Sequence, residues 1–560
     1  MQDRPWLNHY DTGVPFSIDY PPITVPQMLA EAAIKYPDQP CTIFKGAVIT
    51  YQHMNQLTDR LAVALINQGV RPGDRVGILL PNIPQFVLSY FGILKAGGVV
   101  VAINPQYKSN EIQSQINDSG INTLIALSSN YPLLKQLQPQ TCLKSIILTR
   151  INEYLPQVLA FIFNLSKARR SNERVIPSHP DHWLKDLLDQ QPAGLIPDVT
   201  LSPDQDALFQ YSGGTTGISK AAIATHRNLI ANALQMRHWL VNTYDGQETV
   251  LMAIPLFHVY GMVCGMLYAI RVGAGMVMIP DARDIPEIMR SIQKYKATIF
   301  HGVPNLFNAI IQNPDAQAKK FNLGSIKACI SGSAPLMRET KERFEALTGG
   351  KLCEGYGLSE APTATHCNPM LGENRVGSIG LPVPDVDCRI VSLEDGVTVL
   401  ETGQIGELII SGPQVMRGYH NMPGETSAVL RNGWLYTGDI ARMDEDGYFY
   451  LVDRKKELIK PGGFQVWPRE VEEVIASHPK VKEVGVAGVM DTQGCELVKA
   501  WVVLKAGEVV SVEEIQDFCR QQLVNYKVPS LVEFCTGLPR STVGKVLRRE
   551  LVRQHNETNN

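Results

Sequence analysis

Residues 211–220 read Tyr211-Ser-Gly-Gly-Thr-Thr-Gly-Ile-Ser-Lys220 and directly follow the apolar run Ala207-Leu-Phe209. Glycines let backbone N–H groups approach an anion closely, and the hydroxyl and ammonium groups add further donors. Such a loop can wrap a polyphosphate. Its spacing does not fit the Gly-x-x-x-x-Gly-Lys-Ser/Thr loop of P-loop NTPases, which removes the main support for a kinase or motor ATPase. Taken alone, the same residues also fit a plain flexible loop.

Patterns on both sides of this loop predict helices that alternate with buried strands. Residues 56–69 place apolar side chains at helical spacing, and after a turn at 71–74 the run 75–80 has the composition of a buried strand. The same alternation returns at 86–97 before 99–103 and at 285–296 before 297–301. This repetition predicts α/β layers with parallel sheets.

The pattern changes where Asp444-Glu-Asp-Gly447, typical of a hairpin turn, precedes a strand-like run and the charged Asp453-Arg-Lys-Lys-Glu457. Beyond this point, a helix start at 468–477, short strands at 484–489 and 500–504, and a helix around 512–523 predict a small α+β domain. We therefore expect a large domain over 1–452, a hinge over 453–456 and a small domain over 457–560.

Length and composition fit a globular protein of at least two domains. The chain has 560 residues, of which 44% are hydrophobic and 19% charged, and a formal net charge of -3. This charge offers no general attraction for nucleic acid, so we expect no such partner. The ten cysteines are irregularly spaced without a Cys-x-x-Cys pair, which favours reduced thiols and a cytoplasmic location. Residues 1–20 lack the basic start and apolar stretch of a signal peptide.

One apolar segment leaves membrane contact open. Residues 154–165 are strongly apolar and precede Lys167, Arg169 and Arg170, as in an interfacial membrane helix. The segment is too short to span a bilayer. Its composition favours the alternative of a buried helix or loop flank with a solvated basic end. Peripheral membrane association is therefore left open. The sequence also leaves open whether the chain forms a homodimer.

Further sequence blocks follow in a fixed order along the whole chain. They are Pro255-Leu-Phe-His258, Ser331-Gly-Ser-Ala-Pro-Leu336, Glu354-Gly-Tyr-Gly-Leu-Ser-Glu360, Tyr436-Thr-Gly-Asp439, Asp453-Arg-Lys-Lys456, Gly462-Gly-Phe464 and Pro539-Arg-Ser-Thr-Val-Gly-Lys545. Together with the glycine-rich loop they resemble the adenylate-forming superfamily of acyl-CoA synthetases, luciferases and peptide-synthetase adenylation domains. Ser219 and Ala221 replace the commoner proline and glycine but leave the donors intact. The resemblance implies a large N-terminal domain of layered α/β subdomains and a small, mobile α+β C-terminal domain.

Three blocks resemble bacterial long-chain fatty-acid–CoA ligases within this superfamily. They are Asn82-Ile-Pro-Gln-Phe86, residues 93–101 and Asn104-Pro105. The resemblance implies that ATP, a fatty acid and CoA are converted into acyl-CoA, AMP and diphosphate through an acyl adenylate, with Mg²⁺ as cofactor.

The resemblance also implies three catalytic residues, because adenylation brings a carboxylate against an anionic triphosphate. Lys545 would bridge the carboxylate and the α-phosphate, Glu360 would ligate Mg²⁺, and the Ser359 hydroxyl, where threonine is commoner, would bond the α-phosphate. Without the motifs, Glu360 reads as a turn residue or helix cap and Lys545 as a surface lysine.

By the same resemblance, Tyr356 stacks on adenine and the Asp439 carboxylate accepts hydrogen bonds from both ribose hydroxyls. Arg454 approaches the ribose and phosphates, although a charged run is more often solvated surface. The full set implied to contact ATP or CoA is Ser212, Gly213, Gly214, Thr215, Thr216, Gly217, Lys220, Ser333, Ala334, Glu354, Gly355, Tyr356, Gly357, Asp439, Arg454, Lys456, Lys460, Gly462 and Gly463.

The acyl pocket and the second half-reaction are assigned in the same way. His258, Tyr260, Gly261 and Met262 lie where the superfamily places the mouth of the acyl pocket, although a satisfied buried histidine explains His258 equally well. Asp453 matches the hinge residue about which the small domain turns for thioester formation. Gly462 and Gly463 match the loop that lines the thiol's channel. Both assignments also fit a plain linker and turn.

Rival interpretations remain at this stage. An aryl-CoA ligase of the 4-coumarate kind or a luciferase uses the same core chemistry on other acids. A peptide-synthetase adenylation domain is disfavoured because the region around His258 is apolar and lacks an acidic residue for an amino group. A nucleotide-binding protein without catalysis is disfavoured by the presence of both Glu360 and Lys545.

Overall fold

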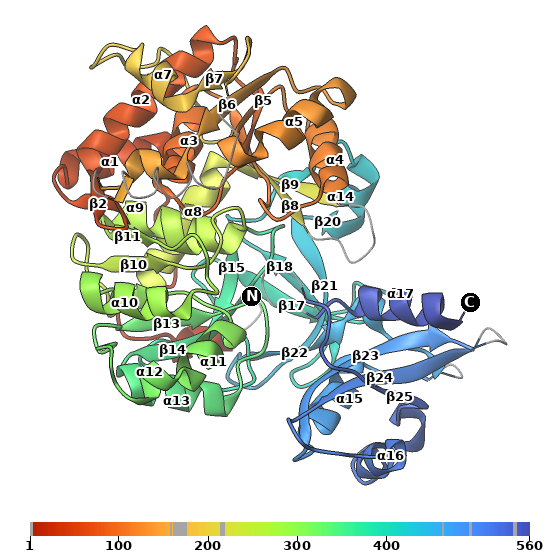
Figure 1. Cartoon of the computed structure of the whole chain (residues 1–560). Helices are drawn as coiled ribbons and strands as arrows, with labels where there is room; N and C mark the ends of the chain where they lie inside the picture. Colours follow the sequence, from red (N-terminus) through yellow and green to blue (C-terminus); the bar gives the residue numbers. More distant parts are fainter. Residues whose placement is uncertain are drawn as a thin grey trace. The chain divides into compact units, whose positions relative to one another are not determined.

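The computed structural model describes residues 4–156, 159–160, 176–212, 219–461, 464–491, 495–540 and 546–559. Contacts between residues divide the chain into two compact units (Figure 1). The larger unit holds His9–Val386 and Gly412–Leu430, and the smaller holds Met1–Asn8, Asp387–Ser411 and Arg431–Asn560. The predicted mixed α/β fold with a large N-terminal and a small C-terminal part is confirmed. The pivot at Asp453 concerns movement and stays a prediction.

The described residues of the larger unit form two sheets. The first contains nine strands in the order β16 (Leu381–Pro382), β15 (Ala364–Cys367), β14 (Lys351–Gly357), β13 (Ala328–Ser331), β12 (Ile299–Phe300), β10 (Thr249–Met252), β11 (Gly275–Met278), β1 (Pro40–Phe44) and β2 (Ala47–Thr50). From β1 to β14 neighbouring strands run parallel, and β2, β15 and β16 are added in antiparallel fashion at the edges.

The second sheet of this unit contains eight strands. Their order is β19 (Gly418–Tyr419), β9 (Lys220–Thr225), β8 (Asp206–Ser212), β4 (Val99–Ala102), β3 (Arg75–Leu79), β5 (Thr123–Leu127), β6 (Ser145–Thr149) and β7 (His182–Trp183). Along this order from β8 to β7, each strand runs parallel to its neighbour. By contrast, β8 and β9 form an antiparallel hairpin that β19 extends.

The alternation of helices and strands predicted from the sequence is confirmed. Helix α2 (Tyr51–Asn67) precedes β3, α3 (Pro84–Lys95) precedes β4, and α10 (Ile285–Tyr295) precedes β12. The strands β3 and β4 are buried almost throughout, as expected when helices cover both faces of a parallel sheet. The other helices of this unit are α1 (Val25–Lys35), α4 (Ser109–Ser119), α5 (Tyr131–Leu137), α7 (Leu184–Asp189), α8 (His226–Trp239), α9 (Tyr268–Val272), α11 (Pro304–Gln312), α12 (Pro314–Gln317), α13 (Arg338–Thr348) and α14 (Pro423–Val429).

Two groups of helices sandwich the nine-stranded sheet. Helices α10, α11 and α13 pack their apolar side chains on one face of β10, β12, β13 and β14 (Figure 1). The opposite face meets α8 and a π-helix, η5 (Tyr260–Leu267), which follows β10. A π-helix is rare and often marks a functional site.

The smaller unit contains two further sheets. The first joins β17 (Asp387–Val391), β18 (Gly406–Ser411), β21 (Trp434–Met443), β20 (Leu430–Arg431) and β22 (Phe449–Arg454). The second joins β23 (Val481–Met490), β24 (Glu496–Leu504) and β25 (Leu531–Phe534). Helices α15 (Pro468–Ala476) and α16 (Val512–Arg520) cover one face of the second sheet, and α17 (Arg548–Asn559) covers the other. The predicted small α+β arrangement is confirmed.

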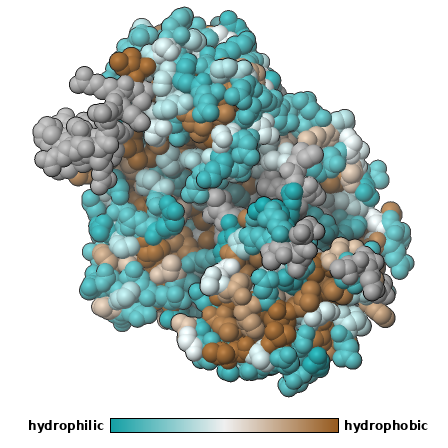
Figure 2. All heavy atoms as spheres, turned by 45° about the vertical axis from the view of Figure 1, so that its right-hand side comes forward, coloured by the Kyte–Doolittle hydropathy of each residue, from teal (hydrophilic) through white to brown (hydrophobic). Residues whose placement is uncertain are grey.

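Apolar side chains also reach the surface of the smaller unit. Figure 2 shows them gathered low on one face, over the region of β23 to β25. The exposed residues of this unit include Phe464, Val524, Tyr526, Leu531 and Phe534. The rings of Phe464 and Tyr526 stack with their centroids 4.6 Å apart. Part of the aromatic surface of this unit therefore lies outside its own core.

The helices within the described ranges include none with the length and apolar character that crossing a bilayer requires. The apolar segment 154–165 lies mostly outside these ranges, since only 154–156 and 159–160 of it are described. Membrane contact through this segment therefore stays a prediction.

Candidate active site

The candidate site residues of the larger unit follow the carboxyl ends of neighbouring strands. Ser333 follows β13, Gly355 and Tyr356 lie at the end of β14, and His258 follows β10. Because β10, β12, β13 and β14 are successive parallel strands, their carboxyl ends meet at one edge of the sheet. In α/β proteins this edge is where ligands bind.

A pocket lies at this edge and holds about 430 Å³ of empty space, open solvent included. Its lining is Met236, His258, Tyr260, Cys264, Ile330, Gly332, Ser333, Gly355, Tyr356, Gly357, Thr363, Ala364, His366 and Cys367. It therefore brings together two residues assigned to the acyl chain, His258 and Tyr260, and several assigned to the nucleotide.

The turn after β14 depends on a glycine. A Cβ atom on Gly357 would lie 1.5 Å from the carbonyl oxygen of Thr363, so any side chain there would force the two strands apart. The N–H of Leu358 donates to the same carbonyl at 3.1 Å. This close approach sets the turn that carries Ser359 and Glu360, both partly buried.

Tyr356 packs against a histidine inside the pocket. Tyr356 pairs with His366 across β14 and β15, and their ring centroids are 5.7 Å apart in an edge-to-face arrangement. Burial lowers the pKa of His366 to about 3, so its ring is neutral near pH 7. The pair therefore presents an uncharged aromatic wall, which suits a purine or an alkyl chain.

Glu354 supports the neighbouring loop. It is buried, and its Oε2 accepts a hydrogen bond of 3.2 Å from the backbone N–H of Leu336. Its carboxylate therefore fixes the loop that holds Ser333 and Ala334. Ser333 is exposed with φ at 70°, and Ala334 is partly exposed, so both present small surfaces at the sheet edge.

The four residues assigned to the acyl pocket divide into two pairs. The Nδ1 atom of His258 accepts a hydrogen bond from the N–H of Tyr260, and the Tyr260 hydroxyl donates to the carbonyl of Ile330 at 2.8 Å. Both line the pocket. Gly261 instead packs on backbone, since a Cβ there would lie 2.5 Å from the carbonyl oxygen of Pro255, and Met262 is fully buried. Desolvation lowers the pKa of His258 to about 4.

Lys220 and Glu360 are brought together by a tyrosine. The Tyr419 hydroxyl donates to Glu360 Oε1 at 2.9 Å, and the Lys220 ammonium lies 5.3 Å from the centre of the Tyr419 ring. Lys220 also forms an ion pair with Glu425. The last residue of the glycine-rich loop and the predicted metal ligand therefore share one partner.

Part of the predicted site lies outside the described residues. This applies to Gly213, Gly214, Thr215, Thr216, Gly217, Gly462, Gly463 and Lys545. Their flanks are described: Ser212 pairs with Lys220 as the last pair of the β8–β9 hairpin. Both ends of the glycine-rich segment therefore lie at one end of this hairpin.

In the smaller unit, Asp439 and Arg454 form a pair. They are opposite each other in β21 and β22, and the Arg454 Nε lies 2.8 Å from a carboxylate oxygen of the buried Asp439. A carboxylate oriented in this way can receive two hydroxyl groups. Lys456 lies in the short 3₁₀ helix η6 (Lys455–Glu457), and the backbone N–H of the exposed Lys460 donates to Glu496.

Several site residues were missed by the sequence analysis, among them Tyr419, His366 and Ile330. Tyr419 reaches Glu360 from 59 residues away through the pairing of β19 with β9. No local pattern marks such a residue, because its role follows from sheet pairing.

Buried neutral histidines make stability depend on pH. Burial lowers the pKa of His226 and His301 to about 4 and that of His366 to about 3. The unfolded chain therefore binds more protons below its histidine pKa of about 6.5, and stability present above that pH is lost as pH falls toward 4. At about pH 5.5 each of the three should cost about 1.4 kcal/mol.

We expect the melting temperature to be lower at about pH 5.5 than at about pH 7.5, by about five degrees if the three contributions add. Differential scanning calorimetry measures this directly. His301→Leu should remove about a third of the shift, since it removes one of the three buried rings that stay neutral in the folded chain. An equal melting temperature at both pH values would contradict the prediction.

Comparison with known proteins gives the family. Residues 29–420 match the family described as AMP-binding enzyme, and residues 470–545 match the AMP-binding enzyme C-terminal domain. A long-chain-fatty-acid–CoA ligase of Bacillus subtilis (strain 168) is 40% identical over 560 residues, which cover 100% of this chain and 99% of that protein. One of Escherichia coli O6:H1 is 38% identical over 98% of this chain and 97% of that protein. The crystal structure of ATP-bound MatB from Rhodopseudomonas palustris has a TM-score of 0.82 at 26% identity, covering 96% of this chain and 100% of that chain.

The fold and the pocket at the sheet edge thus define an adenylate-forming enzyme. The chain belongs to the family of AMP-binding enzymes. The predicted enzyme class, an AMP-forming acid–thiol ligase, is confirmed by this membership and by the full-length similarity to CoA ligases.

Proposed function

We propose that the chain is a long-chain fatty acid–CoA ligase that converts ATP, a fatty acid and CoA into acyl-CoA, AMP and diphosphate through an acyl adenylate. The observation that carries the proposal is the pocket at the sheet edge. Among the residues that the structure describes, its lining includes no Asp, Glu, Lys or Arg, and its two histidines are neutral near pH 7. Such a lining suits an alkyl chain and offers no partner for the amino group of an amino acid. The full-length similarity to long-chain-fatty-acid–CoA ligases supports the same substrate class.

In the first half-reaction, two anions must meet, and the chain's own residues reduce their repulsion. Lys220 places an ammonium beside Tyr419, and the Tyr419 hydroxyl orients the Glu360 carboxylate. Magnesium usually takes one or two protein carboxylates together with substrate phosphates, so an oriented Glu360 fits as its ligand. When bound, Mg²⁺ supplies charge neutralisation of the phosphates. Ser359 would donate its hydroxyl to the α-phosphate.

In the second half-reaction, the CoA thiol attacks the acyl carbonyl and AMP leaves. We assign Asp453 as the pivot for a turn of the C-terminal domain 457–560, and Gly462 and Gly463 as the lining of the thiol's path. Asp439 and Arg454, already paired in β21 and β22, would hold the ribose of the nucleotide. Lys545 would serve the first half-reaction only.

Two further hypotheses concern association. Residues 154–165 would make peripheral membrane contact, and the chain would form a homodimer. Sedimentation with liposomes, compared between the full chain and a variant with Lys167, Arg169 and Arg170 changed to serine, tests the first. Analytical ultracentrifugation tests the second.

The substrate assignment predicts that palmitate exceeds 4-coumarate and acetate in kcat/KM. Each methylene buried in the pocket contributes about 0.8 kcal/mol, so acetate should be disfavoured by at least about a hundredfold. Diphosphate release with ATP, Mg²⁺ and each acid, with and without CoA, measures this. A clear preference for 4-coumarate would identify an aryl-CoA ligase instead. If none of the acids tested gave diphosphate release, the proposed function would be overturned.

A further inference from the structure

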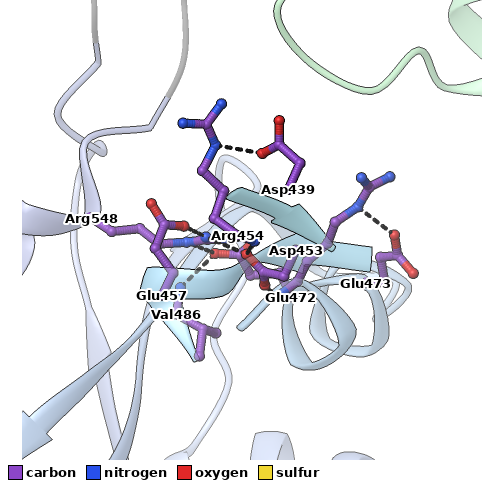
Figure 3. A network of polar contacts seen from close by, with 9 residues as sticks. Asp439, Asp453, Arg454, Glu457, Glu472, Glu473, Val486 and Arg548 are labelled. Atoms are coloured by element: carbon purple, nitrogen blue, oxygen red, sulfur yellow. Dashed lines mark hydrogen bonds and ion pairs between the residues drawn. The ribbon is translucent and has the colours of Figure 1, made fainter. Parts of the chain in front are cut away.

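Arg548, the first residue of α17, lies at the centre of a cluster of ion pairs in the smaller unit. Its guanidinium is 3.1 Å from Asp453 and 2.7 Å from Glu472, and it also pairs with Glu457 (Figure 3). The side chain of Arg548 is only 17% exposed and that of Asp453 only 2%. One cation therefore compensates three largely buried carboxylates.

The cluster joins elements that are distant in sequence. Asp453 lies in β22, Glu457 in η6 and Glu472 in α15. Backbone groups complete it: the N–H of Arg469, near the start of α15, donates to Asp453 at 2.6 Å, and the N–H of Val486 in β23 donates to Glu472 at 2.8 Å. The guanidinium thus fixes the end of β22 against α15 and α17.

The charge balance makes this arginine hard to replace. Burial disfavours its charge, but Glu472, Asp453 and Glu457 outweigh burial and raise the pKa of Arg548 above its usual value. Removing one partner of a buried ionic cluster leaves uncompensated charge, which costs far more than losing an exposed pair. The nearby Arg469 does not substitute, because its side chain pairs with the exposed Glu473.

Arg548 also stands three residues after Lys545 in the sequence. The flanks of the segment that carries Lys545 pair with each other. Arg540 and Val546 form an isolated antiparallel β-bridge, and the N–H of Leu547 donates to the carbonyl of Pro539 at 2.8 Å. Arg540 is in turn held by Glu483 in β23. The chain that follows Lys545 is therefore tied to the same cluster as Asp453.

We propose that Arg548 is a positioning residue for the adenylation half-reaction. It anchors the chain beside Lys545 to the Asp453 pivot, so that the position of the Lys545 ammonium depends on the conformation of the backbone at Asp453. This inference rests on the proposed function, because it takes Lys545 and Asp453 in the roles given there. Arg548 contacts no substrate in this account. It acts through the position of Lys545.

The test compares Arg548→Lys and Arg548→Met in the full chain. Misplacing a catalytic group by about 1 Å can cost about a hundredfold, so adenylation of palmitate should fall about 10- to 100-fold. Lysine keeps the charge but not the forked geometry, and it keeps the test valid if the methionine variant fails to fold. Thioester formation from supplied palmitoyl-AMP and CoA should change less than about threefold, since Lys545 has no part in it. The matched control is Arg469→Met, which removes an equal side chain but keeps the N–H that binds Asp453.

A double variant separates positioning from a general structural role. If Arg548 acts through Lys545, then Arg548→Lys combined with Lys545→Ala should adenylate no more slowly than Lys545→Ala alone. The inference would be overturned if the adenylation losses of the two single variants multiplied in the double variant. It would also be overturned if Arg548→Lys slowed both half-reactions equally, or if it left adenylation unchanged. If the wild-type chain adenylates no fatty acid, the proposed function itself fails, which the wild-type arm reveals separately.

Discussion

Lys545→Ala should slow acyl-adenylate formation by about 10²- to 10³-fold, the loss seen when one preorganised charge-stabilising group is removed. Its ammonium is expected between the incoming carboxylate and the α-phosphate, where negative charge accumulates during attack. Single-turnover formation of palmitoyl-AMP in a rapid-quench experiment measures the effect.

The same variant should keep the second half-reaction. Thioester formation from supplied palmitoyl-AMP and CoA should stay within about tenfold of wild type, a barrier change of about 1.4 kcal/mol. Lys545→Arg is the matched control, because it keeps the charge while changing its geometry. Adenylation at the wild-type rate, or loss of both half-reactions in a folded protein, would show that Lys545 does not have this role.

Asp453→Pro should impair thioester formation by about a hundredfold more than Asp453→Ala does, because proline fixes φ at the proposed pivot. The substitution also removes a carboxylate that holds Arg548 and the N–H of Arg469. Asp453→Ala removes the same carboxylate without restricting φ, so it is the necessary comparison. The rate of palmitoyl-CoA formation from supplied palmitoyl-AMP, measured for both variants, isolates the backbone effect.

The pivot assignment requires the proline and alanine variants to differ. If both lose thioester formation equally, the carboxylate and its contacts matter rather than the backbone torsion. Circular dichroism and the melting temperature of each variant show whether the network around Arg548 survives the substitution.

Much of the fold could be predicted because it is encoded locally. Residues 75–80 and 99–103 read as buried strands and contain β3 and β4, and the helical spacing of 56–69 overlaps α2, which ends at Asn67. The composition of the compact units could not be predicted in this way. Residues 387–411 join the C-terminal part because β17 and β18 pair with β21, and pairing between distant strands leaves no local signature.

The candidate site shows the same division. Glu360 and Lys220 could be assigned from motifs, since each stands at a fixed place in a recognisable block. Tyr419 and Arg548 could not, because their importance comes from partners on other elements. Gly261 and Met262 stand beside His258 in sequence, yet the pocket lining includes His258 and Tyr260 and not these two, and residue spacing alone does not predict the geometry of the π-helix that carries them.

The most direct test of the account is a single turnover with ATP, Mg²⁺ and palmitate, without CoA, analysed by mass spectrometry and followed by addition of CoA. The account predicts enzyme-bound palmitoyl-AMP and an equal amount of diphosphate in the first stage, then conversion to palmitoyl-CoA and AMP in the second. Formation of ADP and phosphate, or palmitoyl-CoA formation without a palmitoyl-AMP intermediate, would contradict it.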